Sequence, residues 1–269
     1  YNHKSLDAAI ICVIWQMILA DALSVNLYWY HNFILGVSVW LCYSADRFME
    51  YPLPRSDSAQ RYEVFKTSRR LFKILWTLAL VLCVSLSFTC LSPLCLLFSF
   101  PLLLLCLLNF ALCIQEMNLG KASYLFKELR TALILALGCV LFPIFERSMD
   151  TSGIAVYFFS LTYIFLLNCL FVSRWEQSND RKRGRLSIIQ QNPRLLEFLL
   201  SSKNIFSLFF FFLWLTNSHA INFFAFVFLV VVFVITLDFL AFREDEKRQL
   251  IDHVYWLVPL LLVLLVHVG

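Results

Sequence analysis

Long apolar runs, separated by short polar segments, are the dominant pattern of this chain. Most of the runs approach the ~20 residues that an α-helix needs to cross a lipid bilayer. Prolines stop the second run at Pro52 and Pro54, and polar hinges such as Ser92-Pro93 separate neighbouring runs. The pattern predicts an all-α, polytopic membrane protein with nine helices, at 6–28, 31–50, 71–91, 93–114, 122–145, 153–176, 203–217, 219–242 and 252–268.

The nine predicted helices are expected to form one transmembrane domain over residues 1–269, since the sequence contains no low-complexity tract. The seventh helix is the shortest, and a start near Leu195 is the alternative to a start at 203. Because eight apolar runs follow the first, we do not expect the first run to be a cleaved signal peptide.

The composition supports a bilayer environment for these helices. Of 269 residues, 61% are hydrophobic and 28 are Phe, and a soluble domain of this size has too little interior to bury so much apolar surface. The nine cysteines all lie in apolar stretches and include no Cys-x-x-Cys pair. We therefore interpret them as small core residues, and not as a disulfide framework or a metal site.

Basic residues gather on one side of the predicted bundle. Of the 22 Lys and Arg residues, 21 lie on the N-terminal segment, on the even-numbered loops or on the helix ends that face them, and Arg147 is the exception. The positive-inside rule then predicts that the N-terminus and the even loops are cytoplasmic. The expected location is a multi-pass position in a bacterial inner (plasma) membrane.

Two pairs of acidic residues stand at the cytoplasmic ends of the second and sixth predicted helices: Asp46 with Glu50, and Glu176 with Asp180. A spacing of four residues puts both carboxylates of a pair on one helix face. Carboxylates and substrate phosphates are typical ligands of Mg²⁺, so these four residues are candidate ligands for a metal that neutralises a diphosphate. The alternative is that they are ordinary solvated acids, which pair with Arg47, Arg174 and Arg181.

Several further polar residues have both a functional and a structural interpretation. Lys127 either binds a phosphate or extends its amine to the headgroup layer, and Arg47 either binds phosphate or pairs with an acid. Asn168 contacts substrate or makes an interhelical hydrogen bond. Asp21, expected deep in the first helix, either helps to bind an acceptor or satisfies a neighbouring helix.

The motifs resemble those of the UbiA superfamily of intramembrane prenyltransferases. That family has nine helices, a motif NDxxDxxxD at the end of helix 2 and a motif DxxxD at the end of helix 6. Here the segment 45–50 is similar to the second half of the first motif, and the segment 176–187 (Glu-x-x-x-Asp-x-x-x-Gly-x-x-Ser) is similar to the second. Tyr124 and Lys127 stand where the family carries a Tyr and a Lys at the start of helix 5.

The resemblance implies an Mg²⁺-dependent prenyltransferase of isoprenoid-quinone or related lipid biosynthesis. A polyprenyl diphosphate would bind with its headgroup between helices 2 and 6, and a small, usually aromatic acceptor would receive the prenyl group. The implied partners are these two substrates and the lipid bilayer, with no nucleic acid. The implied catalytic metal ligands are Asp46, Glu50, Glu176 and Asp180, and the implied substrate-binding residues are Lys127, Tyr124, Arg47 and Asn168.

The chain also departs from the family pattern. In the acidic segment 42–50, Cys42 and Tyr43 occupy the family's Asn and Asp positions, and each acidic pair contains one Glu where Asp is usual. These departures favour an alternative, a catalytically degenerate relative that binds an isoprenoid or lipid or serves as a subunit of a membrane complex. A transporter, with charged helix ends along its pathway, is the second alternative.

Overall fold

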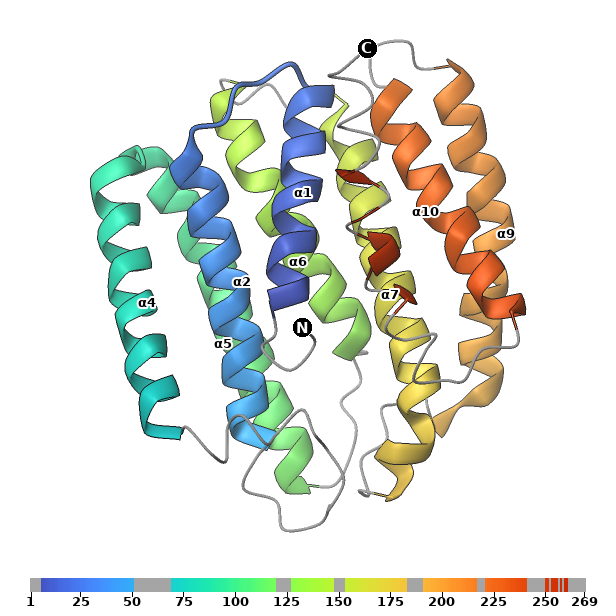
Figure 1. Ribbon diagram of the computed structural model, residues 1–269, viewed down its shortest axis with the longest axis horizontal. Coiled ribbons are helices and arrows are strands. Elements are labelled where there is room, and N and C mark those ends of the chain that lie inside the picture. The colour runs from blue at the N-terminus through green and yellow to red at the C-terminus, as the bar shows by residue number, and fades with distance from the viewer. Residues whose placement is uncertain are drawn as a thin grey trace.

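The computed structural model describes residues 6–50, 69–119, 127–147, 153–182, 191–216, 221–240 and, except for 252, 256 and 258, residues 250–260. Within these ranges the chain is helical and forms no strand. The helices run alternately up and down one bundle (Figure 1). They are α1 (Leu6–Ala22), α2 (Trp29–Glu50), α4 (Arg69–Cys90), α5 (Pro93–Leu119), α6 (Lys127–Glu146), α7 (Ile154–Lys182), α9 (Pro193–Thr216) and α10 (Ile221–Phe239).

Helix length and composition agree with the predicted membrane class. Five helices are long and apolar enough to cross a membrane, and α10 contributes a shorter apolar helix over Asn222–Asp238. The predicted all-helical, multi-pass architecture is therefore confirmed at this level. The ninth predicted helix, 252–268, lies largely outside the described residues, of which those between 250 and 260 are helical.

The start of α9 differs from the predicted start at residue 203. The helix begins at Pro193, and the backbone N–H of Leu196 donates to the carbonyl of Asn192 at 3.1 Å. Proline suits the first position of a helix because its missing N–H has no partner there in any case. The alternative start near Leu195 was therefore close, and the start at 203 was wrong.

The first helix is shorter than predicted, since α1 ends at Ala22 and not at residue 28. Ser24 has a φ of 54°, its N–H donates to Asp21 O at 2.9 Å, and the N–H of Val25 donates to Ala20 O at 2.8 Å. This pair of bonds around a left-handed residue is the Schellman arrangement that ends helices. Asp21 consequently lies near a helix end, where it is exposed, and not deep in a span.

Large side chains from α1, α7 and α10 fill the centre of the bundle. Trp15, Phe171 and Phe223 are completely buried, and the rings of Trp15 and Phe223 meet edge to face with centroids 6.1 Å apart. The nine cysteines are free and none is exposed, which agrees with their interpretation as packing residues.

Helix α2 approaches α1 and α6 closely at two glycines. A Cβ atom on Gly36 would lie 3.1 Å from Val13 Cγ2, and one on Gly138 would lie 3.1 Å from Leu35 Cδ1. Larger side chains at either position would push α2 outward. This close packing holds α2 against α6, the helix that carries Lys127.

The outer helices α4, α5 and α9 present apolar side chains to the surroundings. Leu78 and Phe88 of α4, Leu97 of α5 and Ile205 of α9 are each more than half exposed. Apolar surface on this scale is typical of helices that contact lipid.

Candidate functional site

Asp46 and Lys127 lie side by side, although they are far apart in the sequence. Asp46 belongs to the last turns of α2 and Lys127 is the first residue of α6. Lys127 Nζ lies 3.7 Å from Asp46 Oδ1, and the two side chains are 41% and 31% exposed. A partly exposed pair at this distance adds little to stability, at most about 1 kcal/mol, so both groups remain accessible to a charged ligand.

The next residue, Glu128, connects α6 to α7. Ser173 Oγ of α7 donates to Glu128 Oε1 at 2.8 Å, and Glu128 is only 7% exposed. Two consecutive residues at the start of α6 thus contact the two helices that carry the acidic pairs, Lys127 on α2 and Glu128 on α7. The sequence analysis did not single out Glu128 or Ser173, and only the rotation of α6 and α7 about their axes brings the two together.

The ends of α2 and α7 and the start of α6 lie at the same end of the bundle (Figure 1). Glu50 follows Asp46 by one turn in α2, and Asp180 follows Ser173 by seven residues in α7. At 100° per residue, position 180 falls within roughly 20° of the helix face that carries Ser173. On the backbone, position 180 therefore falls on the side of α7 that meets α6.

Several predicted site residues lie outside what the structure describes. The side chains of Arg47, Glu50, Glu176 and Asp180 are in this group, as is Tyr124 as a whole. Their proposed roles therefore stay predictions.

Asn168 stands apart from the Asp46–Lys127 pair on the surface of α7. It precedes Ser173 by five residues, which puts it roughly 140° around the helix from the face that meets Glu128. Its Oδ1 atom is buried and has no hydrogen-bond partner. The predicted contact of Asn168 with substrate stays a prediction.

The residue types at this end of the bundle fit a hard divalent cation. Among the positions whose side chains are described, no three His, Cys, Asp or Glu residues converge, and of the four predicted ligands only Asp46 belongs to those positions. Its carboxylate is partly exposed and lies beside a lysine. Carboxylate oxygens on a partly open helix end, supplemented by water and phosphate, match the preference of Mg²⁺.

A second charged cluster joins α7, α9 and α10. Asp238 accepts from Lys203 Nζ at 2.6 Å and from Arg174 at 3.1 Å, and Lys203 also lies 5.4 Å from the ring centroid of Phe171. This cluster was not predicted from the sequence, because the predicted helix 203–217 puts Lys203 at a helix start. Since α9 begins at Pro193, Lys203 lies nearly three turns inside it and is 8% exposed.

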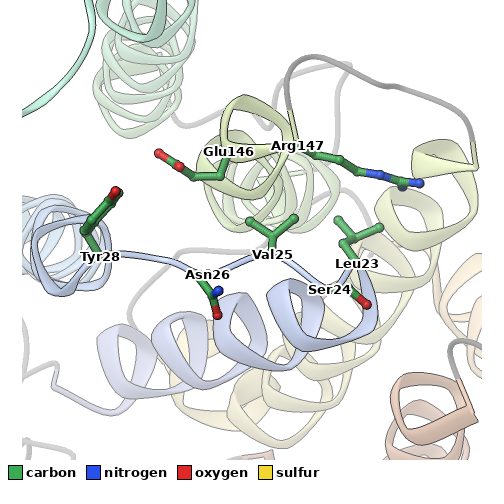
Figure 2. A pocket seen from close by; sticks show the side chains of 7 residues that line it. All are labelled: Leu23, Ser24, Val25, Asn26, Tyr28, Glu146 and Arg147. Carbon is green, nitrogen blue, oxygen red and sulfur yellow. The ribbon is translucent and has the colours of Figure 1, made fainter.

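The opposite end of the bundle holds an open polar pocket of about 380 Å³, between the α1–α2 connection and the end of α6 (Figure 2). Glu146 and Arg147 point to opposite sides of it, Glu146 toward Tyr28. Glu146 Oε1 also lies 3.6 Å from Nε2 of the buried His31. The pocket is lined by Leu23, Ser24, Val25, Asn26, Tyr28, Glu146 and Arg147, and thus by none of the predicted site residues.

Comparison with known proteins gives no relative, because no protein-family model, curated protein or solved structure matches the chain significantly. The functional interpretation therefore rests on the residues and on their geometry.

Proposed function

We propose that this chain is an Mg²⁺-dependent, UbiA-like prenyltransferase that transfers a polyprenyl group from its diphosphate to a small aromatic acceptor. The observation that carries the proposal is the contact of Lys127 with Asp46, 3.7 Å apart across α6 and α2. A metal-bound diphosphate needs carboxylates for the metal and a cation for the phosphate oxygens. Asp46 and Lys127 supply one group of each kind, at the end of α2 and the start of α6, and α7 ends at the same end of the bundle (Figure 1).

The two residues exchange partners when the substrate binds. In the absence of a ligand, Lys127 and Asp46 balance each other's charge. A bound diphosphate would take Lys127 as its partner, and Asp46, together with Glu50, Glu176 and Asp180, would then hold the metal. Bound Mg²⁺ would neutralise the departing diphosphate.

The apolar outer surface supports a lipid-soluble substrate. The isoprenoid chain of a polyprenyl diphosphate partitions into the bilayer, while its charged end stays at the rim. Helices with lipid-exposed faces, such as α4, α5 and α9, place the Asp46–Lys127 pair where a substrate of this kind can arrive from the membrane.

The arrangement in the membrane belongs to the same proposal. Nine spans, a cytoplasmic N-terminus and a bacterial inner membrane account for the 21 of 22 basic residues on one side. Among the described residues, Lys127 and Arg174 lie at this end of the bundle and Arg147 at the other. Labelling of single introduced cysteines with a membrane-impermeant reagent checks the orientation. The loop 51–68 should react only after the cells are opened.

The central test compares two lysine substitutions. Lys127→Met should weaken binding of geranylgeranyl diphosphate in the presence of Mg²⁺ by about 10- to 100-fold, because it removes a charge-assisted hydrogen bond. Lys73→Met changes an exposed lysine of α4 and should leave binding unchanged. Binding is measured by titration of the purified protein, and transfer by incorporation of labelled prenyl groups into a panel of aromatic acceptors.

The outcomes separate the proposal from its competitor. Cys42 and Tyr43, in place of the family's Asn and Asp, favour a degenerate relative that binds the diphosphate without turnover. Binding without transfer to any acceptor would establish that reading, whereas transfer that is lost in Asp46→Asn supports the enzyme. If the wild-type protein neither binds diphosphate nor transfers the prenyl group, both readings are excluded.

A further inference from the structure

Glu128 is an unusual acidic residue for this protein. Among the Asp and Glu side chains that the structure describes, it is the one that is buried, at 7% exposure. Its Oε1 atom accepts the hydroxyl of Ser173 at 2.8 Å, whereas its Oε2 atom is buried and has no hydrogen-bond partner. One oxygen of this carboxylate is therefore hydrogen-bonded within the protein, and the other has no partner there.

A buried carboxylate oxygen without a partner is unfavourable, and nearly all buried polar atoms in proteins have one. In the described residues, Ser173 is the one hydrogen-bond partner of Glu128, so an apolar residue at this position would remove the unpaired oxygen and lose one hydrogen bond. The unpaired oxygen can accept a hydrogen bond from a bound molecule that supplies a donor. Such a donor also has to be small and lipid-compatible to reach a buried position between α6 and α7.

The position of Glu128 relates it to the proposed diphosphate site. It directly follows Lys127, whose partly exposed amine faces Asp46 on α2, while Glu128 itself faces α7 and is much less exposed. A substrate headgroup on Lys127 and a second molecule on Glu128 would thus be held by neighbouring residues of one helical turn.

We propose that Glu128 is the acceptor-recognising residue and that Oε2 accepts a hydrogen bond from a hydroxyl group of an uncharged acceptor. The inference rests on the proposed prenyltransferase function and goes further by naming the class of acceptor. A carboxylate lodged at this position repels a second carboxylate in surroundings of low dielectric constant. Phenols or alcohols without an acid group are therefore accepted, and aromatic acids are disfavoured.

The test uses two acceptors that differ in charge and share a phenol ring, 4-hydroxybenzyl alcohol and 4-hydroxybenzoate. The wild-type protein, supplied with geranylgeranyl diphosphate and Mg²⁺, should prefer the neutral acceptor by roughly 10-fold or more in kcat/KM, as expected for like charges in a partly buried site. Glu128→Gln keeps the shape and removes the charge, so the preference should fall to roughly 1. Ser173→Ala keeps the charge and is the matched control that should retain the preference.

The outcomes of the acceptor comparison separate the role of Glu128 from the proposed prenyltransferase function. Equal use of the two acceptors by the wild-type protein, or a preference that survives in E128Q, overturns the role of Glu128 and leaves the proposed prenyltransferase intact. Absence of diphosphate binding in the wild-type protein overturns both. Diphosphate affinity and thermal unfolding of E128Q show whether it is folded, and if it is not, the wild-type ratio for the two acceptors still decides.

Discussion

The ion pair of Lys203 with Asp238 is short and largely removed from solvent. The two charged atoms are 2.6 Å apart, and the side chains are 10% and 15% exposed. Removing water from two charges is costly, and a buried pair is tolerated because each charge compensates the other. Arg174 adds a third charge from α7, but its side chain is 46% exposed and remains hydrated. We therefore expect Lys203 and Asp238 to affect the free energy of unfolding more than Arg174 does.

Substitutions in this cluster should show the difference. Asp238→Asn leaves a buried ammonium without its counter-charge and should lower the free energy of unfolding by about 3 kcal/mol. Arg174→Gln removes an exposed partner and should change it by less than about 1 kcal/mol. Thermal unfolding of the purified variants in one detergent measures both effects. Equal losses in the two variants would contradict the assignment of Lys203 and Asp238 as the buried pair.

Single residues also show how far the sequence could predict the candidate site. Lys127 and Asp46 were candidates because of residue type and place at helix ends, and these are visible in the sequence. The bond between Glu128 and Ser173 was not predictable, because it depends on how α6 and α7 are rotated about their axes. Helices that are apolar on all sides carry no amphipathic pattern from which that rotation can be inferred.

At the scale of whole elements, the existence of the helices was predicted better than their ends. Apolar runs of this length indicate directly that α2, α4 and α6 exist. The residues at which a helix begins and ends depend instead on local features such as prolines, charges and turns. The end of α1 depends on a serine in the left-handed region at φ 54°, a conformation for which glycine or asparagine is the usual signal. Serine gives no such signal, so the six-residue error in the end of α1 has a physical cause.

The left-handed turn at the end of α1 allows a test in which one substitution has opposite effects at two sites. Ser24→Gly relieves the strain of a side chain at positive φ and should stabilise the protein by up to about 1 kcal/mol. Ser201→Gly, in the middle of α9, should destabilise it by about 0.5 kcal/mol, because glycine is a poor helix former. The midpoint of thermal unfolding should rise for the first variant and fall for the second. A fall in both would argue against the Schellman end of α1.

For the molecule as a whole, the exposure of apolar side chains follows from the bilayer. Helices α4 and α5 bury only 6% of their most apolar windows inside the protein. In water such a surface would drive aggregation, whereas in lipid it needs no partner. The class of architecture was therefore predictable from composition, while the packing of α6 and α7 in the interior was not.

Two positions of α4 with equal exposure but different depth test this account. Val81, near the middle of the helix, is 58% exposed, and Leu71, near its start, is 59% exposed. Val81→Lys should make membrane insertion of α4 less favourable by about 3 kcal/mol, since a charge at the bilayer centre is unfavourable. The amount of protein in the membrane fraction should fall accordingly. Leu71→Lys should have little effect, because its amine reaches the headgroup layer. Equal membrane levels for both variants would contradict a transmembrane α4.

The first turn of α6 contacts two other helices through two consecutive residues. Lys127 holds α2 and Glu128 holds α7, and the two residues are joined by a single peptide unit, which is rigid and planar. Under the proposed function, a ligand that takes Lys127 from Asp46 would therefore act within one residue of the hydrogen bond that joins α6 to α7.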